Sequence, residues 1–146
     1  MHTCTFFGHK DTPSAVSVPL KQTIIKLIEQ ENVTCFYVGN QGKYDSMVAR
    51  TLKEIKVNYP HIKLAIVLAY MPDKKDKTSW DYADTIYPEG LEKTPPRFAI
   101  DKRNEWMLKH SDYVVSYVEH RIGGAAKFTE RAIKRGKKVI NLASIE

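Results

Sequence analysis

The sequence has few of the features that mark membrane, secreted or metal-binding proteins. No apolar run is long enough to cross a bilayer, and the first ten residues lack the basic segment and apolar stretch of a secretory signal. Cys4 and Cys35 form no Cys-x-x-Cys motif, and the five histidines lack the spacing of metal ligands. We therefore expect a cytoplasmic protein with reduced thiols, no membrane partner, and neither metal nor cofactor.

The charge of the chain is positive but is not gathered in one segment. The 146 residues include 23 Lys and Arg and 17 Asp and Glu, which gives a formal net charge of +6. The basic residues form no stripe with interleaved aromatics, so the pattern does not favour nucleic acid as a partner. A positive field also attracts phosphorylated small molecules, so charge alone does not choose the partner.

Short apolar runs alternate with segments of helical periodicity. This alternation predicts an α/β fold: one Rossmann-like domain over residues 1–146, with a mostly parallel sheet between helices. The predicted strands are 3–9, 33–40, 62–70, 113–118 and 138–143, and the predicted helices are 19–32, 41–60, 97–112 and 123–137.

Residues 71–96 form a stretch too long for an ordinary connection, and long loops are often functional. Its aromatic side chains Trp80, Tyr82 and Tyr87 could cover a bound base as a lid. The alternative is that these rings pack on the domain or on a second subunit.

Glycines and polar side chains follow three of the predicted strands, and parallel strands end at one edge of a sheet, where α/β proteins bind ligands. Each signal has a plain alternative: the glycines could only make turns, and His9 could be a hydrogen-bonded strand-end histidine. Gly123 to Ala126 provide no capping side chain for the helix that follows, so its first N–H groups need water or an anion. The candidate binding residues are Gly8, His9, Lys10, Gly39, Asn40, Gly42, Gly123, Gly124 and Ala125, with Lys127 as a further source of charge.

Arg103 and Glu130 lie on helices at positions that need explanation. Helical spacing to Trp106 and Met107 places Arg103 on the inward side, where it requires a carboxylate or phosphate unless its head reaches solvent. Glu130 lies at the border of the apolar face, and its plain role is an exposed pair with Lys134.

The segment RNEWMLKHSDYVV, followed by GGAAKFTE, resembles the signature of the SLOG superfamily, which includes the Lonely Guy phosphoribohydrolases and the DprA/Smf proteins. Similarity over nearly the whole chain is closer to the YpsA-like branch, through FFGHKDTP, YVGNQGKYDSMV and YPEGLEKTPPRFAIDKRNEWM. The matching positions are Arg103, Met107 and Asp112 in the first part of the signature, and Gly123, Gly124 and Glu130 in the second.

The resemblance implies a site for a nucleotide. In the Lonely Guy enzymes the matching Arg and Glu act in cleaving the N-glycosidic bond of a nucleoside monophosphate, so Arg103 and Glu130 are the candidate catalytic residues. Ile122, Ala126 and Lys127 depart from the motif and weaken the case for turnover.

The first hypothesis is therefore a domain that binds a nucleotide or nucleotide-derived ligand without turnover, in the manner of a sensor. The alternative is a nucleotide N-glycosidase that releases base and ribose 5-phosphate. A weaker alternative, from the kinship with DprA and the positive charge, is single-stranded DNA binding. Relatives commonly form dimers, so the resemblance also implies a homo-oligomer.

Overall fold

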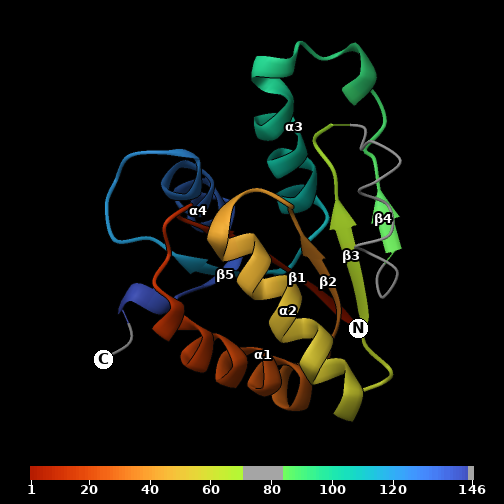
Figure 1. Cartoon of the computed structure of the whole chain (residues 1–146), viewed down its shortest axis with the longest axis vertical. Helices are drawn as coiled ribbons and strands as arrows, with labels where there is room; N and C mark the ends of the chain where they lie inside the picture. The colour runs from red at the N-terminus through yellow and green to blue at the C-terminus, as the bar shows by residue number, and fades with distance from the viewer. Residues whose placement is uncertain (71–83, 145–146) are drawn as a thin grey trace.

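The structure is a computed structural model that describes residues 1–70 and 84–144 (Figure 1). The strands are β1 (His2–Gly8), β2 (Val33–Val38), β3 (Lys63–Val67), β4 (Asp84–Ile86), β5 (Tyr113–Tyr117) and β6 (Lys138–Asn141). The helices are α1 (Ser17–Glu31), α2 (Gly42–Asn58), α3 (Pro96–Lys109) and α4 (Gly124–Lys134), with short 3-10 turns η1 (Ser14–Val16), η3 (Leu91–Lys93) and η4 (Leu142–Ser144).

The strands form one parallel sheet in the order β4-β3-β2-β1-β5-β6. The chain builds outward from β1 to β4 and then returns to place β5 on the other side of β1. The order therefore reverses between β1 and β5, which is where open α/β sheets commonly bind ligands. The predicted α/β fold with a parallel sheet and helices is confirmed.

Helices cover both faces of the sheet (Figure 1). Phe6 and Phe36 face a core that includes Leu20 of α1 and Leu52 of α2. On the opposite face, Phe7 of β1 stacks on Phe128 of α4, in a core that also contains residues of α3. Because β1 is covered on both faces, its sequence is a continuous apolar run rather than an alternating one.

Residues 71–96, expected to be one long loop, contain a strand in their described part. Asp84–Ile86 pairs with β3 as β4, η3 follows at Leu91–Lys93, and α3 begins at Pro96. A three-residue edge strand bounded by an acidic residue and a proline is too short for periodicity to identify. No helix in residues 1–70 or 84–144 has the length and apolar character needed to span a membrane.

Gly8 allows a close approach between α2 and the end of β1. The Tyr44 ring lies so near that a Cβ on Gly8 would fall within 2.6 Å of three ring atoms. The Tyr44 hydroxyl donates a hydrogen bond of 2.8 Å to the carbonyl of Val115 in β5. Tyr44 therefore crosses β1 and ties the start of α2 to the strand beyond it.

We expect Gly8→Ala to lower the free energy of unfolding by about 2 kcal/mol, because the added methyl overpacks a buried ring. Gly124→Ala is the matched control: a Cβ there meets no atom within 4 Å. It should change stability by less than about 0.5 kcal/mol. Urea unfolding followed by circular dichroism measures both, and equal stabilities for the two variants would contradict the role given to Gly8.

Candidate functional site

Three loops meet at the edge of the sheet where β1, β2 and β5 end. The His9 N–H donates to the carbonyl of Tyr117 at 3.3 Å, and the Lys43 N–H donates to the carbonyl of Lys10 at 3.0 Å. The loop after β1 is therefore held between the end of β5 and the first turn of α2. The structure brings the three predicted strand ends together, as parallel strands require.

His9 is buried and its ring already has partners. Its Nε2 atom accepts the N–H of Glu119 at 3.0 Å, and the ring stacks on that of His120 with centroids 3.9 Å apart and planes 10° from parallel. The carbonyl of His9 accepts the Thr12 hydroxyl at 2.6 Å. This arrangement matches the alternative considered above, a strand-end histidine held by hydrogen bonds.

Protonation of His9 should loosen this connection. Burial, assisted by the nearby His120, lowers the pKa of His9 below its ordinary value of 6.5, although Asp11 and Glu119 oppose the shift. The folded state thus favours the neutral ring, whose Nε2 lone pair accepts the Glu119 N–H. The stability that His9 contributes is present above pH 6.5 and is lost as the pH falls through its folded-state pKa.

His9→Gln offers a test, because its amide oxygen can accept a hydrogen bond but does not titrate. Chemical denaturation at pH 7.5 and pH 5 should show a smaller loss of stability for His9→Gln than for the unmodified chain. An identical loss in the two proteins would contradict the prediction. Measuring His9→Gln against the unmodified chain at each pH cancels the titration of all other groups.

Gly39, at the end of β2, separates two buried charged side chains. A Cβ on Gly39 would lie 2.6 Å from Nη1 of Arg103 and 2.7 Å from Oδ2 of Asp45. Asp45 comes from α2 and Arg103 from α3, which cover opposite faces of the sheet, so the two charges meet beyond its edge. Gly39 is needed here for space, while Asn40 lies exposed in the turn that follows.

Hydrogen bonds fix both charged groups. Arg103 donates from Nη1 to the carbonyl of Val67 at 3.0 Å and from Nε to the Asn104 side chain at 2.8 Å. Asp45 accepts the N–H of Gln41 at 2.9 Å. Arg103 thus lies near a carboxylate, one of its expected partners, across Gly39, while its direct hydrogen bonds go to the end of β3 and to Asn104.

The electrostatics of this pair reflect its burial. Burial raises the pKa of Asp45 to about 6, although the charge of Arg103 and the Gln41 N–H both act to lower it. Burial lowers the pKa of Arg103, and Asp45 opposes that shift. Each charge thus offsets part of the desolvation cost of the other.

The start of α4 lacks a side-chain cap, as predicted from the sequence. Gly123 has φ of 104°, a left-handed conformation that favours glycine, and Gly124 and Ala125 begin the helix. Neither Gly123 nor Gly124 is required by packing, because a Cβ on either would meet no atom within 4 Å. Gly124 is thus open to close approach by a ligand.

Glu130 lies apart from Arg103. Its side chain is 69% exposed and pairs with Lys134 at 3.3 Å, the exposed pair considered above. It lines a pocket of about 300 Å³ beside Val118 and Arg121. Because the contacts of Arg103 are at the ends of β2 and β3, the structure does not bring the two candidate catalytic residues together.

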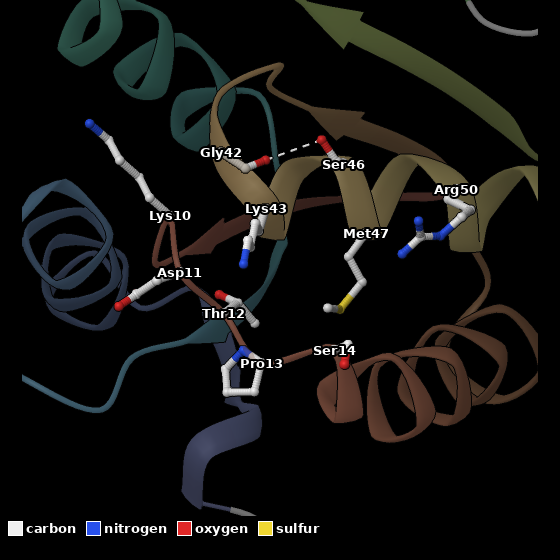
Figure 2. A pocket seen from close by; sticks show the side chains of 10 residues that line it. All are labelled: Lys10, Asp11, Thr12, Pro13, Ser14, Gly42, Lys43, Ser46, Met47 and Arg50. Carbon is white, nitrogen blue, oxygen red and sulfur yellow. Dashed lines mark hydrogen bonds between the residues drawn. The ribbon is translucent and has the colours of Figure 1, made fainter.

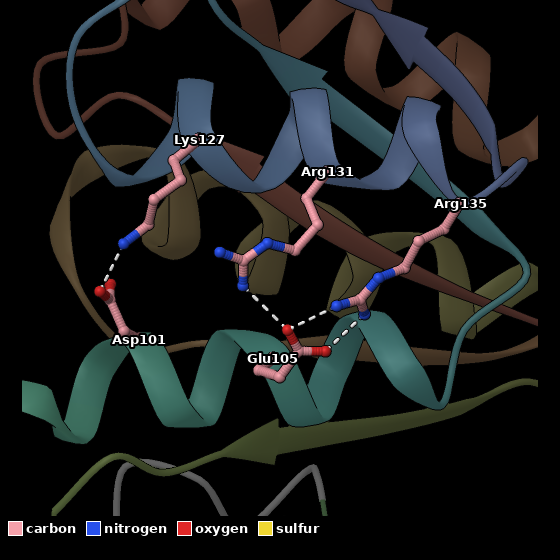
Figure 3. A network of polar contacts seen from close by, with 5 residues as sticks. All are labelled: Asp101, Glu105, Lys127, Arg131 and Arg135. Carbon is pink, nitrogen blue, oxygen red and sulfur yellow. Dashed lines mark hydrogen bonds and ion pairs between the residues drawn. The ribbon is translucent and has the colours of Figure 1, made fainter.

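Ion pairs connect α3 to α4 (Figure 3). Lys127, expected to add charge to a ligand site, instead pairs with Asp101 at 2.5 Å. Glu105 pairs with Arg131 at 2.9 Å and with Arg135 at 2.5 Å, and these partners lower the pKa of Glu105. The basic side chains on this face of α4 are therefore occupied by carboxylates of α3.

A pocket of about 610 Å³ lies between the loop after β1 and the first turns of α2 (Figure 2). Lys43 extends into it from α2, and Arg50 reaches back along the helix toward Met47 (Figure 2). Neither cation forms an ion pair with any described residue. The lining comprises Lys10, Asp11, Thr12, Pro13, Ser14, Gly42, Lys43, Ser46, Met47 and Arg50.

Lys10 and Gly42 of this lining are among the candidate binding residues, and Asp11, Thr12 and Lys43 lie in the polar segments that follow the predicted strands. Gly42 has φ of 85°, and a Cβ there would come within 3.0 Å of the Lys10 backbone. Arg50 and its pairing with Lys43 were missed, although their seven-residue spacing places the two side chains on one face of a helix. That spacing is the sequence signal that could have indicated two cations on one side of a pocket.

The predicted lid falls partly outside the described residues. Trp80 and Tyr82 lie in the segment 71–83, for which no structure is described. Tyr87 is half-buried and packs against the core that contains Leu91 and Ala99. Its position matches the alternative of an aromatic ring packed on the domain. Among the described residues, no group of three or more His, Cys, Asp or Glu could hold a metal ion.

The parallel sheet, its helices on both faces and its open carboxyl edge define a Rossmann-like α/β domain. A sequence model described as the YspA SLOG family matches residues 2–144. The chain therefore belongs to the YspA SLOG family, and the predicted resemblance is confirmed. Membership supports a nucleotide-related or DNA-binding role in general.

Two individual proteins illustrate the relationship. A UPF0398 protein of Brevibacillus brevis is 24% identical over 140 residues, which cover 89% of this chain and 74% of that protein. The DNA processing protein A (DprA) of Streptococcus pneumoniae superposes with a TM-score of 0.69 at 18% identity, over 95% of this chain and 49% of that one. This chain thus spans about half the length of DprA, and the likeness shows the fold alone.

Arg103→Met should lower the free energy of unfolding by about 3 kcal/mol, because it leaves the buried Asp45 charge and the Val67 carbonyl without their partner. Glu130→Gln is the comparison, since it also removes one charge but from an exposed pair. It should change stability by less than about 0.5 kcal/mol. Urea unfolding of both variants is the measurement; a tolerated Arg103→Met would show that its buried contacts are not structural.

Proposed function

We propose that this protein binds an anionic, nucleotide-derived small molecule in the pocket between the loop after β1 and α2. The observation that carries the proposal is the pair Lys43 and Arg50, two cations that line one pocket without ion pairs to the described residues. A phosphate group would supply the missing negative charge through charge-assisted hydrogen bonds.

The position and size of the pocket support the same conclusion. Its volume of about 610 Å³ is in the range of small-molecule sites, and it lies at the carboxyl edge of the sheet. The positive end of the α2 dipole also favours an anion there. No aromatic side chain lines this pocket, so it offers no platform for stacked bases of single-stranded DNA.

Binding is a better match to the geometry than N-glycosidic cleavage. Cleavage requires an acid or base at the sugar together with groups that position the substrate. Arg103 is engaged with Val67 and Asn104, whereas Glu130 is exposed beside Lys134. We therefore expect no free base when the protein is incubated with a panel of nucleoside monophosphates. Base release that disappears in Glu130→Gln would favour the enzyme instead.

Isothermal titration calorimetry with adenosine 5′-monophosphate tests the binding site. Lys43→Met and Arg50→Met should each weaken binding about tenfold, since each removes a charge-assisted contact. Lys109→Met removes the same charge at the exposed end of α3, on the opposite edge of the sheet, and should leave affinity unchanged. Equal losses in all three variants would indicate only a general effect of net charge.

A further inference from the structure

A second cavity continues the pocket along the groove between α1 and α2. It has a volume of about 360 Å³, and Arg50 lines both cavities. Along α2 the first cavity ends at Arg50 and the second extends from Arg50 through Thr51 to Glu54. The opposite wall is formed by η1 in the first cavity and by α1, which follows η1 in the chain, in the second. The two cavities are therefore successive parts of one groove.

Thr51 gives the second cavity its most specific feature. Thr51 is only 4% exposed and lines this cavity, yet its hydroxyl takes part in no hydrogen bond with a described residue. The hydroxyl is not one of the fully buried unpartnered groups of the described residues, so it is reached from the cavity, where a ligand or a water can bond to it. A bound group with a hydroxyl could satisfy it.

The two cavities differ in charge. The first has two unpaired cations, Lys43 and Arg50, whereas the second shares only Arg50 with it, at their junction, and its own Lys21 pairs with Glu54 at 3.7 Å. The remaining polar groups of the second cavity are the hydroxyls of Ser17 and Thr51 and the amide of Gln22. Such neutral donors and acceptors suit hydroxyl groups rather than a second anion.

We propose that the second cavity is a subsite for the hydroxyl-bearing part of a phosphate ester, whose phosphate lies beside Lys43 and Arg50. The ligand class is thus a sugar phosphate or a nucleotide in which the sugar faces Thr51 and Gln22. This inference rests on the proposed function, because it assumes that the first pocket holds the phosphate.

Calorimetry with two phosphate monoesters tests the subsite. Ribose 5-phosphate and methyl phosphate carry the same phosphate group, but only the first has hydroxyls to occupy the second cavity. We expect the unmodified chain to bind ribose 5-phosphate at least tenfold more tightly than methyl phosphate. Thr51→Val, which keeps the side-chain shape, should reduce that preference at least threefold and leave methyl phosphate binding unchanged.

Two controls separate a ligand contact from a structural one. Because the Thr51 hydroxyl has no partner among the described residues, Thr51→Val should be no less stable than the unmodified chain in urea unfolding. Gln22→Met, on exposed α1 surface, should also reduce the preference for ribose 5-phosphate without loss of stability.

The outcomes distinguish the two proposals. If both esters bind equally, and Lys43→Met weakens both, the subsite is wrong while the phosphate site stands. A preference for ribose 5-phosphate that survives both Thr51→Val and Gln22→Met also overturns the subsite. If neither ester nor adenosine 5′-monophosphate binds, the proposed function fails and the subsite fails with it.

Discussion

The ring of Tyr44 lying across Gly8 is the contact on which the arrangement of the site depends. It requires the absence of a Cβ on β1, and its hydroxyl reaches past β1 to the carbonyl of Val115. Burial raises the pKa of Tyr44 well above 10, so the hydroxyl remains a donor. This contact holds the first turn of α2 against the loop after β1, and the walls of the pocket follow from that position.

The glycines at the carboxyl edge serve different physical purposes. Gly8 and Gly39 make room for side chains that arrive from helices, whereas Gly42 and Gly123 adopt left-handed backbone conformations. Gly124 neither makes room for a neighbouring side chain nor adopts a left-handed conformation. A sequence shows that glycine follows each strand, but it does not show which side chain approaches or whether the space remains free for a ligand.

The fold could be predicted because its signal is local: apolar runs and helical periodicity alternate along the chain. The contacts of individual side chains could not be predicted in this way. Helical spacing placed Arg103 on an inward face, yet its carboxylate, Asp45, comes from a helix on the other face of the sheet. The strand β4 was not predicted because three residues carry no period. The sequence places Lys43 and Arg50 on one face of a helix but does not show that they lack ion-pair partners.

The reversal of strand order between β1 and β5 would ordinarily be the place for a ligand. Here the stacked rings of His9 and His120 and the hydrogen bond from Glu119 connect the two strand ends. The same loop continues from His9 to Ser14 and forms one wall of the pocket beside α2. These contacts with the loop after β5 therefore hold the loop after β1 on the side opposite the pocket. A ligand bound between this loop and α2 does not have to break them. Unpaired cations lie on that side of the loop, whereas Lys127, near the start of α4, is neutralised by Asp101.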